Sequence, residues 1–189
     1  MSMLVLASDD ARADLAAFAA AGLPTFPPFD FERSARAPDG TERKVAFSLA
    51  FTSSPALPRA GFFACQHHFP ERFWREALQR HANGVDGIAS VTMVAANPAD
   101  HHDFLSRVTG CRDFASSGYG LSFALANGRL DVLAPEAFRH RFGVEAGASR
   151  DARFRAVTLR VSDADVVCEQ LARADVAHTV RGGLVVVDG

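Results

Sequence analysis

Leu4-Val5-Leu6-Ala7-Ser8-Asp9-Asp10 is a short apolar run that ends in polar residues, and an Ala-rich helical stretch follows it as far as Gly22. The pattern returns at Val91-Thr92-Met93-Val94-Ala95-Ala96-Asn97-Pro98 and again at Val157-Thr158-Leu159-Arg160-Val161-Ser162-Asp163. Each copy predicts a buried strand, a polar helix cap and an amphipathic helix of roughly a dozen residues. The chain therefore carries a weak internal repeat.

Short strands, rather than a second helix, follow the first two of these helices. Apolar and polar residues alternate over 29–33 and 43–52. Asn127-Gly128 separates two apolar runs, which is typical of a tight hairpin. We therefore predict an α+β fold in which repeated β-α-β-β-β units form curved mixed sheets with helices outside.

The repeat also predicts the domain organisation and the local helix signals. We expect a first unit with its connecting segment over 1–84 and a second domain over 85–189, made of a full unit (85–143) and an incomplete one (152–189). Asp9 or Ser8 is the predicted cap of the first helix, and Ser162 with Asp165 that of the third. A short helix is expected over 71–78.

Composition excludes several classes of protein. The 189 residues are 48% hydrophobic and 22% charged, with a formal net charge of −2, which are values of a globular chain without a nucleic-acid-binding charge. We find no apolar run near the ~20 residues of a membrane span, and the N-terminus does not resemble a secretory signal. Three separated cysteines indicate reduced thiols, so we expect a cytoplasmic protein.

Adjacent histidines, His67-His68, are the strongest candidates for a site. Neighbouring residues on a strand point to opposite faces, so one ring should face the cup of the sheet and the other the helix layer. The sequence leaves open which of the two histidines faces the cup. We favour Gln66 and His68 for the cup, because a strand face with two polar groups is harder to bury under a helix. The alternative is a hydrogen-bonded structural pair near Trp74.

Phenylalanine is concentrated in the first half of the chain. Sixteen phenylalanines occur in all, and eight of those in the first unit suit either core packing or a cup with aromatic walls for a planar or apolar ligand. Our predicted ligand contacts are Gln66, Phe62, Phe47 and Trp74. The basic cluster Arg139-His140-Arg141 is interpreted as a solvated helix end.

One segment carries a family resemblance. Phe63-Ala64-Cys65-Gln66-His67-His68-Phe69-Pro70-Glu71-Arg72-Phe73-Trp74, with His81-Ala82-Asn83-Gly84 and the repeated units, resembles the glyoxalase-like branch of the vicinal oxygen chelate superfamily. That superfamily includes glyoxalases, bleomycin-resistance proteins and ring-cleaving dioxygenases. The resemblance implies paired units around a cup and a divalent metal (Zn, Mn, Fe or Ni), with His68 and His67 as the candidate ligands here.

Two departures from the family pattern matter. Proteins that this chain resembles usually carry a further unit before Met3, and Asp131 stands where the superfamily often places a Glu ligand, without a His to accompany it. We interpret Asp131 as a polar strand residue. Sheet edges left by missing strands favour pairing, so we expect a homodimer.

The function expected from these observations has two forms. The first is a glyoxalase-like, metal-dependent small-molecule enzyme of the lyase, isomerase or dioxygenase type, or the remnant of one. The alternative is a non-catalytic protein that sequesters a small aromatic or hydrophobic compound. No serine-nucleophile or phosphate-loop motif is present, and catalytic residues cannot be assigned. Neither a nucleic acid nor a membrane is an expected partner.

Overall fold

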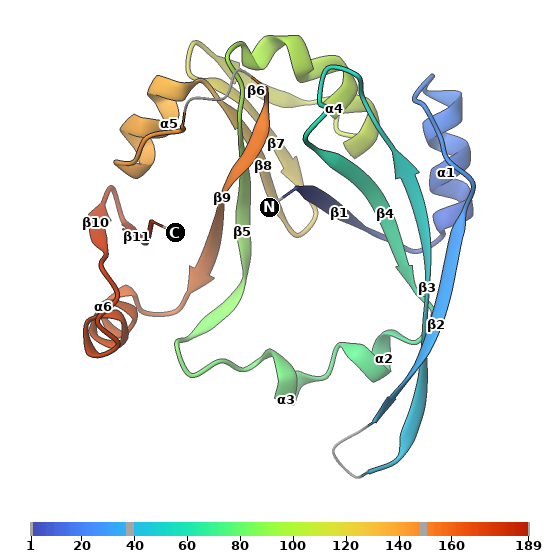
Figure 1. Ribbon diagram of the computed structural model, residues 1–189, viewed down its shortest axis with the longest axis horizontal. Helices are drawn as coiled ribbons and strands as arrows, with labels where there is room; N and C mark the ends of the chain where they lie inside the picture. Colours follow the sequence, from blue (N-terminus) through green and yellow to red (C-terminus); the bar gives the residue numbers. More distant parts are fainter. Residues whose placement is uncertain (1, 37–39, 148–150, 189) are drawn as a thin grey trace. The chain divides into compact units, whose positions relative to one another are not determined.

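The computed structural model describes residues 2–36, 40–147 and 151–188 (Figure 1). The chain divides into two compact units. Unit 1 comprises Met1–Leu78 together with Asp103–Arg112, and unit 2 comprises Gln79–His102 together with Asp113–Gly189. No helix in these described parts is long and apolar enough to cross a bilayer.

Unit 1 is built on a four-stranded mixed sheet with the strand order β1-β4-β3-β2. Strand β1 runs parallel to β4, and the other neighbours are antiparallel. Helix α1 lies along one face of this sheet in Figure 1. The elements are β1 (Met3–Ser8), α1 (Ala11–Ala20), β2 (Phe29–Arg36), β3 (Glu42–Thr52), β4 (Gly61–His67), α2 (Pro70–Phe73), α3 (Glu76–Gln79) and α4 (His102–Thr109).

The cap of helix α1 is Asp10, one residue after Asp9 and two after Ser8, the two predicted caps. Asp10 has an extended backbone, and its carboxylate accepts hydrogen bonds from the backbone N–H groups of Arg12 and Ala13. The prediction of Asp9 or Ser8 as the cap was therefore wrong. Gly22 ends the helix with a φ of 72°, a left-handed conformation that glycine adopts without strain.

Both faces of the unit 1 sheet carry buried apolar residues, but they pack differently. The face towards α1 carries Leu4 and Phe62, and Phe62 has no exposed surface and meets Phe104 of α4 edge-to-face at 5.1 Å. The opposite face carries a separate cluster of Val45, Phe47, Leu49 and Cys65, against which Phe51 and Phe63 pack. Strand alternation divides the phenylalanines between the two faces, because odd and even residues of β4 point in opposite directions.

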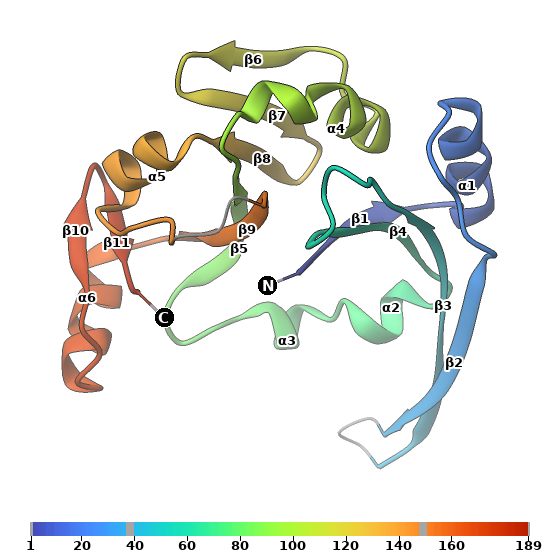
Figure 2. The same ribbon diagram turned by 45° about the horizontal axis from the view of Figure 1, so that its top comes forward.

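Unit 2 repeats this topology and extends it. Its five-stranded sheet has the order β6-β7-β8-β5-β9, so β5 runs parallel to β8 as β1 does to β4. Strand β9 adds antiparallel to the other side of β5. Figure 2 shows β6, β7 and β8 folding back on one another. The elements are β5 (Val85–Val94), the short 3₁₀ helix η1 (Pro98–His101), β6 (Phe114–Ser117), β7 (Gly120–Leu125), β8 (Gly128–Leu133), α5 (Pro135–Phe142) and β9 (Arg153–Val161).

The third copy of the repeat is partial. Helix α6 (Ala164–Arg173) follows β9, and β10 (Thr179–Arg181) with β11 (Leu184–Val186) forms a separate two-stranded sheet. Asp163, rather than Ser162 with Asp165, caps α6 by accepting from the N–H groups of Asp165 and Val166. The predicted fold class, with repeated units and mixed sheets, is confirmed.

One predicted helix is broken in two. The expected helix over 71–78 is replaced by the single turns α2 and α3, because the backbone of Trp74 leaves the helical region with a ψ of 72°. This break places Trp74 outside both turns, with 58% of its surface exposed.

Candidate functional site

Three of the six predicted site residues come together on the face of the unit 1 sheet opposite α1. The ring of His67 meets the edge of Phe47 at 4.8 Å and stacks on Trp74 at 5.6 Å. Phe47 in turn stacks on Phe31 at 4.9 Å, and Phe31 contacts Phe29 at 5.9 Å. We call these five rings, Phe29, Phe31, Phe47, His67 and Trp74, the aromatic row.

Strand register produces the aromatic row. Phe31 on β2, Phe47 on β3 and His67 on β4 are direct cross-strand neighbours, and Phe29 lies two residues along β2 on the same face. Cross-strand aromatic neighbours contribute roughly 0.2–1 kcal/mol per pair relative to alanine. Phe47 in the middle is buried and His67 is partly buried, whereas Phe31 is 39% exposed and Phe29 and Trp74 at the two ends are more than half exposed. The row therefore presents a partly open aromatic surface.

The electrostatics of the row are those of an apolar surface. Burial lowers the pKa of His67 below its ordinary value, since the charged imidazolium loses hydration among aromatic rings. Its imidazole is therefore neutral near pH 7 and is a third kind of planar ring beside phenylalanine and tryptophan. Cys65, on the same strand face, has its thiol pKa raised by burial, so it is not a reactive thiolate.

Gln66 and His68 lie on the other face, which corrects our expectation that they face away from the helix layer. The Gln66 amide bridges to the start of α1: its Oε1 accepts from the N–H of Ala11 at 3.2 Å and its Nε2 donates to the carbonyl of Asp9 at 2.7 Å. We expected burial under a helix to leave Gln66 without hydrogen-bond partners. Backbone groups at the start of α1 provide those partners instead. The polar side chain is therefore compatible with that position.

His68 belongs to a hydrogen-bonded chain beside Gln66. Its Nε2 lies 2.8 Å from the Oγ of Ser48, and a hydrogen bond from Ser48 is the main cause of a lowered pKa at Asp30. Ser48 therefore links the His68 imidazole to the Asp30 carboxylate.

A groove of about 580 Å³ in unit 1 is lined by Ser48, Gln66 and His68, and Phe31 and Phe47 of the aromatic row also border it. Its charged walls are already paired, Arg12 with Asp30 and Lys44 with Glu32. The groove residues Ser48, Gln66 and His68 also have the protein partners described above. A ligand in this groove would have to displace existing ion pairs or hydrogen bonds, so the groove is a weaker candidate than the aromatic row.

Phe62, the remaining predicted ligand contact, is a core residue. It has no exposed surface and packs against Phe104 beneath the helix-covered face. Its ring cannot reach a ligand unless the core opens. The even position on β4 assigns it to the helix side, away from Phe47 and Trp74.

Unit 2 holds a buried ionic cluster around Asp131. The Asp131 carboxylate accepts from Ser122 Oγ at 2.7 Å, from Arg129 Nε at 3.0 Å and from Arg141 Nη1 at 2.7 Å. Burial alone would raise its pKa, but the hydrogen bonds from Ser122 and Arg141 and the charge of Arg129 hold it below the ordinary value. We call Asp131 and its three partners the arginine clamp.

Arg141 of the arginine clamp was not predicted from the sequence as a site residue. Arg141 was interpreted as part of a solvated helix end, but it is drawn inwards to Asp131, whereas Arg139 is exposed near Glu145. Helical spacing could have revealed this, because Arg141 lies three residues after buried Phe138 and four after buried Ala137. The clamp joins α5 to β8.

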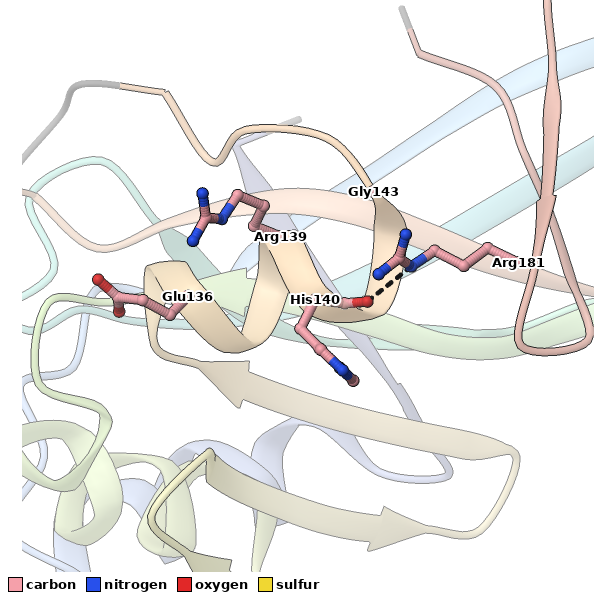
Figure 3. Close-up of a pocket in the computed structure, with 5 residues that line it drawn as sticks. All are labelled: Glu136, Arg139, His140, Gly143 and Arg181. Carbon is pink, nitrogen blue, oxygen red and sulfur yellow. Dashed lines mark hydrogen bonds between the residues drawn. The ribbon is translucent and has the colours of Figure 1, made fainter.

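A hollow of about 300 Å³ lies at the end of α5 in unit 2 (Figure 3). Arg181 Nε donates to the carbonyl of His140 at 2.8 Å, beside Gly143, which closes the helix in a left-handed conformation. Basic side chains commonly bind the last carbonyls of a helix. This hollow is therefore a helix-end contact with the β10–β11 hairpin.

With the geometry established, the sequence can be compared with known families. The profile of the family described as Glyoxalase-like domain matches residues 1–109, more than half of the chain. This chain belongs to the glyoxalase-like domain family. The resemblance predicted from residues 63–74 and the repeat is confirmed.

Solved structures resemble the glyoxalase-like chain at low sequence identity. A crystal structure of a hypothetical protein from Staphylococcus aureus is 11% identical with a TM-score of 0.64, and the alignment covers 98% of this chain and 64% of that one. A xylose isomerase-like TIM barrel/4-hydroxyphenylpyruvate dioxygenase fusion protein is 14% identical with a TM-score of 0.52, covering 94% of this chain and 28% of that one. Methylmalonyl-CoA epimerase from Mycobacterium tuberculosis is 16% identical with a TM-score of 0.40, covering 54% and 73%.

These likenesses show the fold alone. The glyoxalase-like chain spans less than two thirds of the length of the Staphylococcus aureus protein. A comparison with curated proteins gave no match.

The superfamily often binds divalent metals, so we tested whether this glyoxalase-like chain supplies the donors. Within residues 2–36, 40–147 and 151–188, no three or more His, Cys, Asp or Glu side chains gather as a metal site requires. His67 and His68 lie on opposite faces of the sheet. Asp131 is held by two guanidinium groups, which occupy the oxygens that a cation would need. The residues described do not fit a resident metal.

Proposed function

We propose that this glyoxalase-like domain binds a small planar aromatic or hydrophobic molecule on the aromatic row of unit 1, without a resident metal and without chemistry of its own. One observation carries the proposal: five rings in contact form a partly exposed surface whose outer members are more than half exposed. A contiguous exposed apolar surface of this kind often marks a binding site.

The chemistry of the row supports a ligand of that class. Offset-stacked and edge-to-face ring contacts contribute about 0.5–1.5 kcal/mol each beyond the buried area. The imidazole of His67 is kept neutral by burial, so it adds a flat face without a charge to desolvate. The enzymatic alternative, a metal-dependent lyase, isomerase or dioxygenase, has no support from the donor geometry of the described residues.

Fluorescence of Trp74 gives a direct test, since it is the single tryptophan of the chain. We would titrate the purified chain with planar aromatic probes, beginning with 8-anilinonaphthalene-1-sulfonate, and repeat the titration with EDTA. The expected result is saturable quenching or energy transfer that is unchanged by the chelator. The Phe31→Ala variant should weaken binding several-fold.

The controls separate the two faces and the two units. His68→Ala changes the groove face only, and Tyr119→Ala removes an exposed ring from unit 2. Both variants should bind the probe as the wild type does. Absence of saturable binding, or binding that needs a divalent metal and is lost in His68→Ala, would overturn the proposal in favour of no ligand or of a metal site.

Two broader features are also proposed. We propose that the domain works as a homodimer, because the unit 1 sheet has an uncharged outer strand. A cytoplasmic location is proposed because Cys65, Cys111 and Cys168 are unbridged.

A further inference from the structure

Strand alternation keeps the carboxylates of the unit 1 sheet off the face of the aromatic row. On that face, the charged side chains of the described strands β1 to β4 are Arg33 of β2 and Arg43 of β3, with no carboxylate among them. The carboxylates of these strands, Asp30, Glu32 and Glu42, have even positions and point to the opposite face. The strands therefore surround the aromatic row with positive charge only.

Arg33 continues the line of rings along β2. Phe29, Phe31 and Arg33 are alternate residues on one face of this strand, so Arg33 lies about 7 Å beyond Phe31. Its cross-strand neighbour is Val45, which belongs with Phe47 to the apolar cluster of that face. Arg33 therefore borders the ring surface directly.

The charge of Arg33 is not compensated by a neighbour. Its side chain is exposed, and among the described residues it forms no ion pair and no side-chain hydrogen bond. The cations of the opposite face differ, because Arg12 is paired with Asp30 and Lys44 with Glu32. A guanidinium group presents five N–H donors in a planar fork, so Arg33 has its donors available to an anion.

We infer that the ligand of the aromatic row is a planar aromatic anion, whose ring packs on Phe31 and whose carboxylate or sulfonate group binds the guanidinium of Arg33. This inference rests on the proposed function and adds the charge of the ligand to it. An anionic group of this shape accepts two parallel N–H···O bonds from one guanidinium, which are stronger than bonds between neutral groups. A neutral aromatic molecule would gain the ring contacts alone.

Protection of a sheet edge is the other explanation for Arg33. Strand β2 is an outer strand, and charged side chains on outer strands hinder pairing with other chains. Arg36 lies on the same strand and shares that explanation, but its even position places it on the opposite face. Arg36 is therefore a matched control, with the same charge and no place beside the row.

Two probes with one ring system and different charge test the inference on the full chain. Naphthalene-2-carboxylate is an anion near pH 7, and naphthalene-2-carboxamide is a neutral molecule of similar size. Isothermal titration calorimetry should show about fivefold tighter binding of the carboxylate to the wild type. Arg33→Gln should bind both probes as weakly as the wild type binds the amide, whereas Arg36→Gln should keep the fivefold preference.

Two further variants separate the guanidinium from the rings. Arg33→Lys should keep only part of the preference, because an ammonium group retains the charge without the planar fork. Phe31→Ala should weaken both probes by a similar factor, since it removes a ring contact that they share. Added salt should reduce the preference of the wild type for the carboxylate, because the pair is exposed to solvent.

The outcomes distinguish the charge of the ligand from the site itself. If neither probe binds the wild type, both the proposed function and this inference are overturned. If the two probes bind equally, or if Arg33→Gln keeps the preference, the aromatic row remains the proposed site and the anion contact is overturned. An equal loss of preference in Arg33→Gln and Arg36→Gln would reveal a general effect of net charge, which also overturns the contact.

Discussion

Two rows of side chains cross topologically equivalent strands in the two units, and their chemistry is opposite. In unit 1, Phe31, Phe47 and His67 run across β2, β3 and β4 as contacting rings. In unit 2, Ser122 and Asp131 run across β7 and β8 as a hydrogen-bonded pair. One topology therefore supports an aromatic surface in one place and a buried ionic cluster in the other.

The difference is explained by what covers each row. Helix α5 packs on the unit 2 sheet through Phe138 and Phe142 against Val94, and Arg141 on the same helix reaches Asp131. A charge buried there must be paired, so the unit 2 row holds α5 against the sheet. The ends of the row in unit 1 are open, and stacked rings tolerate both water and a ligand. The unit 1 row thus keeps ring surface open to solvent, whereas the unit 2 row is closed by ion pairs and hydrogen bonds.

Breaking the arginine clamp should have the largest effect. Asp131→Asn turns one accepting oxygen into a donor that faces Arg141 or Arg129, so the guanidinium groups lose their counter-charge. Removing one partner of a buried pair costs about 3–5 kcal/mol, and we expect the lower end because both arginines keep solvent contact. Urea denaturation would measure the loss, and probe binding to unit 1 should not change. A loss near zero would contradict the role of the clamp.

Lowering the pH should weaken the arginine clamp without a mutation. The folded-state pKa of Asp131 lies below its ordinary value of 3.8, so its contribution to stability is present above that value. The contribution is lost as pH falls through the lower, folded-state pKa. Thermal unfolding measured on descending from pH 5 should therefore show a loss of stability that is smaller in Asp131→Asn. Equal slopes in the two proteins would rule out this source.

Removing the exposed end of the aromatic row should produce the reverse pattern. Trp74→Ala deletes a ring that is 58% exposed, so unfolding should change by about 1 kcal/mol or less. Probe affinity should fall by up to about tenfold, which corresponds to one lost ring contact. Isothermal titration calorimetry measures this without the tryptophan signal. Large destabilisation with unchanged affinity would make the row a structural feature, like the clamp.

An exposed ion pair in unit 2 should contribute much less to stability than the buried arginine clamp. Asp86 and Arg160 pair at 2.6 Å between β5 and β9, but both side chains are more than half exposed. Solvent screening limits such a pair to about 0.2–1 kcal/mol. Asp86→Asn should therefore shift the urea midpoint far less than Asp131→Asn, and added salt should weaken the pair in the wild type. Equal effects would show that burial does not govern the two pairs.

The sequence was sufficient for the order of elements and the sheet class. Strand periodicity over 43–52 placed β3 within one residue, because apolar spacing is a local property. Local reasoning failed at Trp74, where a helix was expected, and at the two caps, where the neighbouring aspartate took the position. The residue at which a helix begins or breaks depends on backbone angles, and these can change from one residue to the next.

The sequence by itself determined the repeat and the mixed sheets, through the recurring strand and helix periodicities, and the opposite orientation of His67 and His68, through strand alternation. Tertiary structure alone decided which histidine joined the aromatic row, because the packing of α1 selects one face and the start of that helix satisfies Gln66. It also decided that Asp131 is fastened by Arg141, ten residues away along the chain. Helical spacing can indicate that Arg141 faces inwards, but its pairing with a carboxylate on another element is a property of the folded chain.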